Sequence, residues 1–149
     1  MPDIRFYHLT STPLEKALPK LMEKVLANGM RAVVVSGNEQ RMDTLNTCLW
    51  TYSTQTFLPH GSRKDSHPEE QPIYLSTQLE NPNAATVLAI TDDAMPETLE
   101  GFERYLYFFD GNDQDALTKA RMRWKHCKEG EIEVSYWKQN DKGAWEHHS

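Results

Sequence analysis

The sequence predicts an α/β protein in which a mixed, largely parallel sheet carries helices on both faces. Short segments rich in β-branched and aromatic residues alternate along the chain with amphipathic helical segments. One of the short segments is apolar on both of its sides, as a strand covered by helices from two directions must be. The length of 149 residues suits one core, so we expect a single domain over residues 1–149.

The first half of the chain predicts an opening β-α-β unit and a second helix. Residues 4–9 are aromatic and apolar, and Thr12-Pro13-Leu14-Glu15 has the pattern of a capping box with proline at the first helical position. Apolar residues with three-four spacing continue to Asn28-Gly29, where glycine tolerates a left-handed helix stop. Residues 31–36 are the segment that is apolar on both sides. A second helix is expected at residues 38–50, and its inward side chains are Met42, Leu45 and Leu49.

The second half predicts a loop, three strands, a long helix and a terminal hairpin. The proline and charged residues of segment 59–72 predict a surface loop. The strands are expected at residues 73–77, 86–91 and 105–110. A helix follows at residues 113–129. Segments 131–139 and 144–147 then flank Asn140-Asp141-Lys142-Gly143, a turn sequence suited to a hairpin.

This order of elements has the topology of a nucleotide-binding fold without its phosphate loop. The turn at residues 8–13 has no glycine that would let the backbone approach a pyrophosphate, and the Gly-x-x-x-x-Gly-Lys-Ser/Thr pattern does not occur. Gly37 follows the second strand alone, which indicates a backbone requirement rather than a ligand site. A small nucleotide-binding or enzymatic α/β protein is therefore only the alternative function.

Charge and hydropathy weigh against two classes of direct partner. A formal net charge of -6 and an isoelectric point near 5.5 disfavour phosphate binding, which depends on lysine and arginine, so we expect DNA to be contacted only indirectly. No apolar run reaches the roughly 18 to 20 residues of a membrane span, and residues 1–5 do not begin a signal peptide. We therefore expect a cytoplasmic protein with no membrane partner.

Catalytic and metal-binding patterns are incomplete throughout the sequence. Cys48 and Cys127 are too far apart for a zinc motif, have no assigned base and are expected to be buried thiols. Asp92-Asp93 is typical of a solvated turn or helix cap, and the terminal pair His147-His148 lacks spaced partners. We therefore expect no catalytic residue, no metal and no cofactor.

One side of the helix expected at residues 113–129 combines positive charge with an aromatic side chain. This stripe, with spacing i, i+3, i+4 and i+7, contains Arg121, Trp124, Lys125 and Lys128. The neighbouring apolar stripe consists of Leu117, Ala120, Trp124 and Cys127. Trp124 therefore lies at the border of core and solvent, and Arg123 points elsewhere. On an acidic protein such a stripe suits an acidic peptide, because guanidinium groups bind carboxylates strongly. From the residues alone, a solvated helix face is the favoured explanation, because long cationic side chains routinely cover apolar surface without binding a partner.

A second aromatic cluster occurs where the second helix gives way to the predicted loop. This cluster contains Trp50, Phe57, Leu58 and Pro59. Aromatic side chains that gather in an irregular segment are typical of protein interfaces, where they bury much area at little entropic cost. A satellite of the core, which seals a sheet edge from solvent, explains the same residues equally well.

Three segments in register resemble the chi subunit family of bacterial DNA polymerase III. Phe6-Tyr7-His8-Leu9 is similar to the opening strand of that family. Cys48-Leu49-Trp50 with Phe57-Leu58-Pro59-His60 is similar to its middle segment, and Arg121-Met122-Arg123-Trp124-Lys125 to its last long helix. The order and spacing match over nearly the whole chain.

The resemblance implies a non-catalytic accessory subunit of the clamp-loader complex in DNA replication. Such a subunit binds the acidic C-terminal tail of single-stranded-DNA-binding protein and bridges it to the clamp loader through the psi subunit or an equivalent protein. Arg121 and Lys125 correspond to the basic residues used on the tail, Trp124 to an aromatic beside the pocket for its phenylalanine, and Lys128 matches in charge. Trp50 and Phe57 correspond to the psi-facing surface, which is also implied to receive a helicase-like repair protein.

Overall fold

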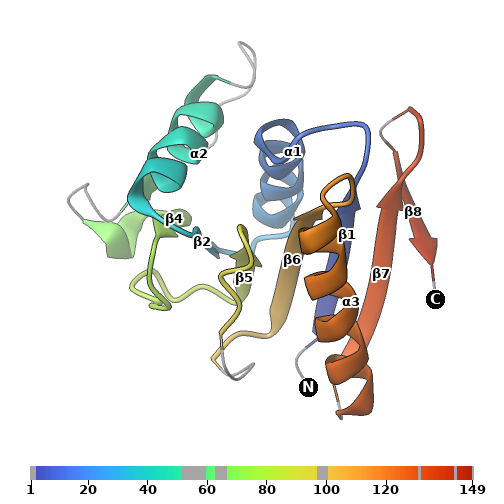
Figure 1. Cartoon of the computed structure of the whole chain (residues 1–149). Coiled ribbons are helices and arrows are strands. Elements are labelled where there is room, and N and C mark those ends of the chain that lie inside the picture. The colour runs from blue at the N-terminus through green and yellow to red at the C-terminus, as the bar shows by residue number, and fades with distance from the viewer. Residues whose placement is uncertain are drawn as a thin grey trace.

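Eight strands pair into one sheet within the described part of the computed structural model, which covers residues 3–51, 60–62, 67–96, 101–130, 132–142 and 144–148 (Figure 1). The strands are β1 (Asp3–Leu9), β2 (Ala32–Val35), β3 (Gly61–Ser62), β4 (Ile73–Ser76), β5 (Val87–Ile90), β6 (Arg104–Asp110), β7 (Glu133–Gln139) and β8 (Trp145–His148). The α-helices are α1 (Leu14–Ala27), α2 (Glu39–Thr51) and α3 (Gln114–Glu129), and Pro68–Glu70 forms a 3-10 turn.

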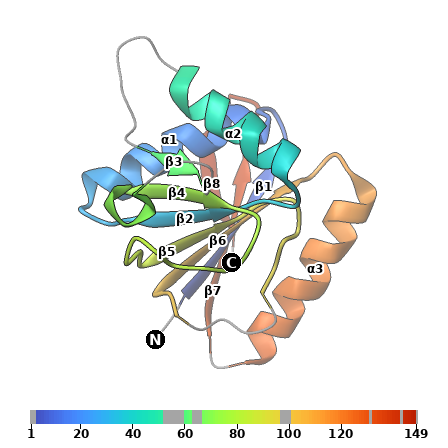
Figure 2. The ribbon, with the colours of Figure 1, turned by 90° about the vertical axis from the view of Figure 1, so that its left-hand side faces the viewer.

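The strand order is β3-β4-β2-β5-β6-β1-β7-β8, and every neighbouring pair is parallel except β7 with β8. The predicted mixed, largely parallel sheet is therefore confirmed. α1 and α2 cover one face and α3 covers the other, which Figure 2 shows from the side. The opening β-α-β unit is also present, although β5 and β6 lie between β1 and β2 in the sheet.

Two cores lie on the two faces of the sheet. Alternate residues of each strand point to opposite faces: Tyr7 packs under α1, while Phe6 packs under α3. The four residues of β2 are all buried, with Ala32 and Val34 in one core and Val33 and Val35 in the other. This double burial explains why that segment is apolar without alternation.

α1 ends as predicted but begins differently. Gly29 adopts a positive φ of 74° and donates its N–H to the Leu26 carbonyl, and Met30 reaches back to Val25, which completes a Schellman motif. The predicted capping box does not form, because Pro13 is the N-cap residue and no side chain caps the helix. The Thr12 amide instead donates to Gln139 Oε1 at 3.2 Å.

The segment predicted as a loop contains a short strand. Gly61 and Ser62 pair in parallel with β4 and are buried, so this part of the prediction was wrong. A two-residue strand carries too little periodicity to be recognised from sequence. α2 follows its predicted pattern, and its fully buried side chains are Met42, Leu45 and Leu49. Residues 52–59 and 63–66 lie outside the described residues.

The remaining elements occur where they were expected. β7 and β8 form the antiparallel hairpin, which is closed by a 2.9 Å hydrogen bond from the Asn140 N–H to the Ala144 carbonyl. In the described ranges, no helix combines the length and the apolar character needed to cross a bilayer.

Candidate functional site

α3 carries the predicted basic and aromatic stripe, and its N-terminus is fixed by Asp113. The Asp113 side chain accepts hydrogen bonds from the backbone of Asp115 and Ala116, as an N-cap residue does. Ala120 and Cys127 are buried against the sheet. Leu117 and Trp124 pack partly buried against the same core, so the predicted apolar stripe is confirmed.

Trp124 lies at the border of core and solvent, in contact with two strands. Its ring packs edge-on against Phe6 of β1, with centroids 5.6 Å apart, and against Tyr136 of β7, with centroids 5.3 Å apart. The Lys128 ammonium lies 4.9 Å from the centroid of the Trp124 ring, in a cation-π contact. The strands therefore fix the indole from below, and Lys128 covers it from the solvent side.

The cations of the stripe are all exposed. Arg121 lies close enough to Tyr136 for its charge to act on that phenol: burial raises the pKa of Tyr136, and Arg121 opposes the rise. Lys125 is exposed one residue beyond Trp124. The structure thus places Arg121 near Tyr136 and Lys128 over Trp124, and it leaves Lys125 exposed.

Arg123 points away from this stripe, as predicted, and holds α3 to the end of β5. Its Nε and one terminal nitrogen donate to the two Asp93 oxygens at 2.5 and 2.9 Å, and the Tyr107 hydroxyl also donates to Asp93. Burial alone would raise the pKa of Asp93, but the hydrogen bonds from Arg123 and Tyr107 lower it below its usual value. Asp92-Asp93, which the sequence predicted as a solvated turn or helix cap, is therefore a turn whose carboxylates form ion pairs.

Sequence reasoning missed two polar groups that lie behind the aromatic site. His8 Nδ1 and the Tyr136 hydroxyl are hydrogen-bonded at 2.5 Å, and Tyr136 in turn supports Trp124. The pair joins β1 to β7, whose residues are separated by most of the chain, and nothing in local spacing indicates that they meet.

Of the second predicted surface, the structure describes only the backbone of its first residue, Trp50. Trp50 lies in the last turn of α2. The Trp50 side chain and the residues Phe57, Leu58 and Pro59 lie outside the described residues. Their role at an interface stays a prediction.

Comparison with known proteins assigns the family. A sequence model of the family described as "DNA polymerase III chi subunit, HolC" matches residues 1–135. The chain belongs to the chi subunit family. A curated protein of Rickettsia prowazekii (strain Madrid E), named "Probable DNA polymerase III subunit chi", is 32% identical over 152 aligned residues, which cover 97% of this chain and 91% of that protein.

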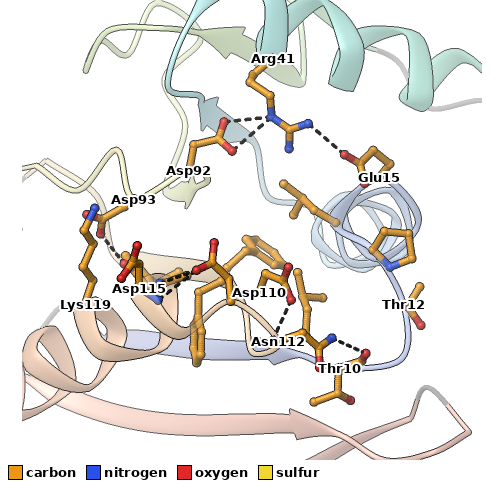
Figure 3. A pocket seen from close by; sticks show the side chains of 18 of the residues that line it. Thr10, Thr12, Glu15, Arg41, Asp92, Asp93, Asp110, Asn112, Asp115 and Lys119 are labelled. Carbon is orange, nitrogen blue, oxygen red and sulfur yellow. Dashed lines mark hydrogen bonds and ion pairs between the residues drawn. The ribbon is translucent and has the colours of Figure 1, made fainter.

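In this chi family chain, a pocket of about 690 Å³ opens at the carboxyl ends of β1 and β6 (Figure 3). The connections from these neighbouring strands lead to opposite faces of the sheet, the position at which α/β proteins commonly bind ligands. The lining carries the acidic side chains Glu15, Asp92, Asp93, Asp110, Asp113 and Asp115. Its cations are Arg41 and Lys119, and Arg41 is already paired with Glu15 at 3.0 Å and Asp92 at 3.2 Å. An acidic lining repels phosphate.

The backbone donors that would hold a phosphate at this pocket are occupied. In nucleotide-binding folds, amides of the turn after the first strand point at the phosphate. In this chi family member, the amides of Thr10 and Thr12 both donate to Gln139 Oε1, at 3.1 and 3.2 Å. The buried carboxamide of Gln139 thus takes the place that an anion would need. Both observations weigh against the nucleotide-binding alternative.

The two thiols of this chi family chain do not have the environment of a nucleophile. Cys127 is buried as predicted, whereas Cys48 is only partly buried, which corrects the expectation for that residue. Burial raises the pKa of both thiols, the opposite of the shift that activates cysteine. Within the residues that the structure describes, no three histidine, cysteine or acidic side chains are grouped to hold a metal ion.

Proposed function

We propose that this chi family protein is a non-catalytic adaptor of the clamp-loader complex that binds the acidic C-terminal tail of single-stranded-DNA-binding protein on α3. Family membership supports a role within DNA polymerase III. The observation that carries the tail-binding step is the position of Trp124, which packs against two strands at the border of core and solvent, under Lys128 and on the same helix as the exposed Arg121 and Lys125. As part of a replication complex, we expect the protein to act in the cytoplasm.

The proposed contacts follow from charge and shape. The tail is an acidic peptide that ends in proline and phenylalanine, and its terminal ring packs against Trp124 beside the methylene stem of Lys128. Arg121 and Lys125 meet the carboxylates of the peptide, because both are exposed and neither has a carboxylate within salt-bridge distance among the described residues. Tyr136 behind Trp124 keeps the indole in place during binding.

A second surface completes the bridge to the clamp loader. We propose that Trp50, Phe57, Leu58 and Pro59 bind the psi subunit or an equivalent clamp-loader protein, and that a helicase-like repair protein uses the same residues. α2, which carries Trp50, covers the opposite face of the sheet from α3. The tail and the second partner therefore approach from different sides, and DNA is reached only through the tail-bearing protein.

Titration of a labelled tail peptide tests the site on α3. We expect Arg121→Ala and Lys125→Ala each to weaken binding by a factor of roughly 1.4 to 5, because an exposed ion pair contributes about 0.2–1 kcal/mol. The loss should shrink when the ionic strength rises, since salt screens exposed charges. Fluorescence polarisation at low and moderate salt measures both effects.

Lys119→Ala is the matched control, because Lys119 is an exposed lysine on the same helix that faces the acidic pocket. It should leave the affinity unchanged. A tail peptide without its last phenylalanine should bind more weakly to every variant. Unchanged affinity in both Arg121→Ala and Lys125→Ala removes the tail from this site.

A further inference from the structure

A groove on the α1 face of the sheet combines two indoles with positive charge. The groove lies between the C-terminal half of α1 and the β7–β8 hairpin and has a volume of about 190 Å³. Trp137 and Trp145 form one wall and are partly buried against the core. The other wall is apolar and contains Leu21 and Val25 of α1. We call this site the indole groove.

The two indoles are held in fixed orientations. Trp145 packs edge-on against Tyr7 on the floor, with centroids 5.0 Å apart. Trp137 donates from Nε1 to the Ser135 hydroxyl at 3.1 Å, and its ring lies against His147, with centroids 4.8 Å apart. Because their contacts are made within the protein, little side-chain entropy remains to be lost when a ligand binds.

The rim of the indole groove is positively charged. Arg104 is paired with Asp3 at 3.2 Å, but no carboxylate of the described residues lies within salt-bridge distance of Arg5 or Lys24. Arg5 lies close enough to Tyr7 for its charge to act on that phenol: burial raises the pKa of Tyr7, and Arg5 opposes the rise. The nearby carbonyls at the end of α1, which would repel an anion, already accept from Asn28, Gly29 and Met30.

Size and charge select the class of ligand. The volume is below the roughly 300 Å³ at which pockets for whole small molecules begin, so one side chain enters rather than a nucleotide. Two uncompensated cations on a protein of net charge -6 favour carboxylates on the incoming chain. An acidic peptide with one large apolar side chain satisfies both conditions.

We propose that the indole groove is a second docking site, separate from α3, for a short acidic peptide of a partner protein. The peptide inserts one aromatic side chain beside Trp137 and Trp145 and places its carboxylates against Arg5 and Lys24. α3 and the indole groove lie on opposite faces of the sheet, so both sites accept a peptide at the same time.

Nuclear magnetic resonance of the indole N–H groups tests this site directly. The probe is the acetylated and amidated peptide Asp-Glu-Asp-Phe-Asp-Glu-Asp, added to the full ¹⁵N-labelled protein. Tryptophan-to-phenylalanine variants assign each indole signal. We expect the Trp137 and Trp145 signals to shift and saturate together. Lys24→Gln and Arg5→Gln should each weaken binding roughly two- to fivefold.

Lys20→Gln is the matched control, because Lys20 is an exposed lysine on α1 outside the groove, and it should leave the affinity unchanged. Shifts confined to Trp124 would place the peptide on α3 alone and overturn the proposal. The absence of any shift, or equal effects of Lys20→Gln and Lys24→Gln, would do the same. If an oligothymidine shifts Trp137 and Trp145 while the peptide does not, the occupant is nucleic acid and the proposal is wrong.

Discussion

At Gly111 the main chain passes so close to His8 that no side chain fits between them. A Cβ atom there would lie 1.8 Å from Nε2 and 2.1 Å from Cδ2 of the imidazole. The imidazole is fixed, because it is buried and its Nδ1 is hydrogen-bonded to the Tyr136 hydroxyl. Space, rather than an unusual backbone conformation, therefore requires glycine at this position.

We expect Gly111→Ala to lower the free energy of unfolding by about 1–3 kcal/mol, since forcing atoms into a packed site displaces its neighbours. Urea denaturation followed by circular dichroism measures the loss. Gly130→Ala is the matched control, because a Cβ there would meet only the Cys127 carbonyl oxygen, at an ordinary 3.5 Å. Equal stability of the two variants would show that the His8 side chain can move aside without lowering the free energy of unfolding.

At the scale of elements, the turn after β5 ties both helical layers to the sheet. Asp92 and Asp93 adopt positive φ angles of 55° and 57°, which are uncommon for residues other than glycine. Asp92 is paired with Arg41 of α2, and Asp93 is paired with Arg123 of α3. One strained turn thus contacts the two helices that carry the proposed partner surfaces.

The lowered pKa of Asp93 makes stability depend on acidity in a defined direction. A carboxyl group whose folded pKa is depressed stabilises the fold fully above the pKa of the unfolded residue, about 3.9, and loses that contribution as the pH falls through the lower folded value. Asp93→Asn removes this contribution while asparagine still accepts a positive φ. At neutral pH we expect the free energy of unfolding of Asp93→Asn to be about 1–3 kcal/mol lower than that of the wild type.

Urea denaturation between about pH 6 and pH 2 checks the direction of this effect, because the wild type and Asp93→Asn should become alike in acid. Asp141→Asn, which changes an exposed aspartate in the hairpin turn, is the control and should follow the wild type throughout. A constant difference between wild type and Asp93→Asn over the whole range would contradict the ionic role of Asp93.

At the scale of the whole molecule, the two proposed partner surfaces are separable. We expect tagged Phe57→Ala protein to recover single-stranded-DNA-binding protein from a native lysate but to lose the clamp-loader partner. The double variant Arg121→Ala, Lys125→Ala should show the reverse, because its changes lie on α3, which covers the face of the sheet opposite α2. Mass spectrometry of the captured proteins measures both. Recovery of every replication protein by Phe57→Ala at the level of the wild type would contradict the second surface.

The sequence was sufficient for elements whose pattern is local. Periodic apolar residues located α1 and α3, and double-sided apolarity identified β2 as a strand with a helix on each face. Contacts between distant segments were not predictable, because spacing along the chain says nothing about them. The Gln139 contact with the turn after β1, the Arg123–Asp93 pair and the Tyr136 support of Trp124 are all of this kind.

The place of β1 in the sheet has a consequence for biosynthesis. In the register of the strands, Asp3 is opposite Arg104 on one side and Glu133 on the other. A ribosome therefore releases this apolar strand long before either neighbour has been translated, and the nascent chain must keep it away from wrong pairings in the meantime. β1 leaves the exit tunnel before β6 and β7, and it can pair with them only after both have emerged.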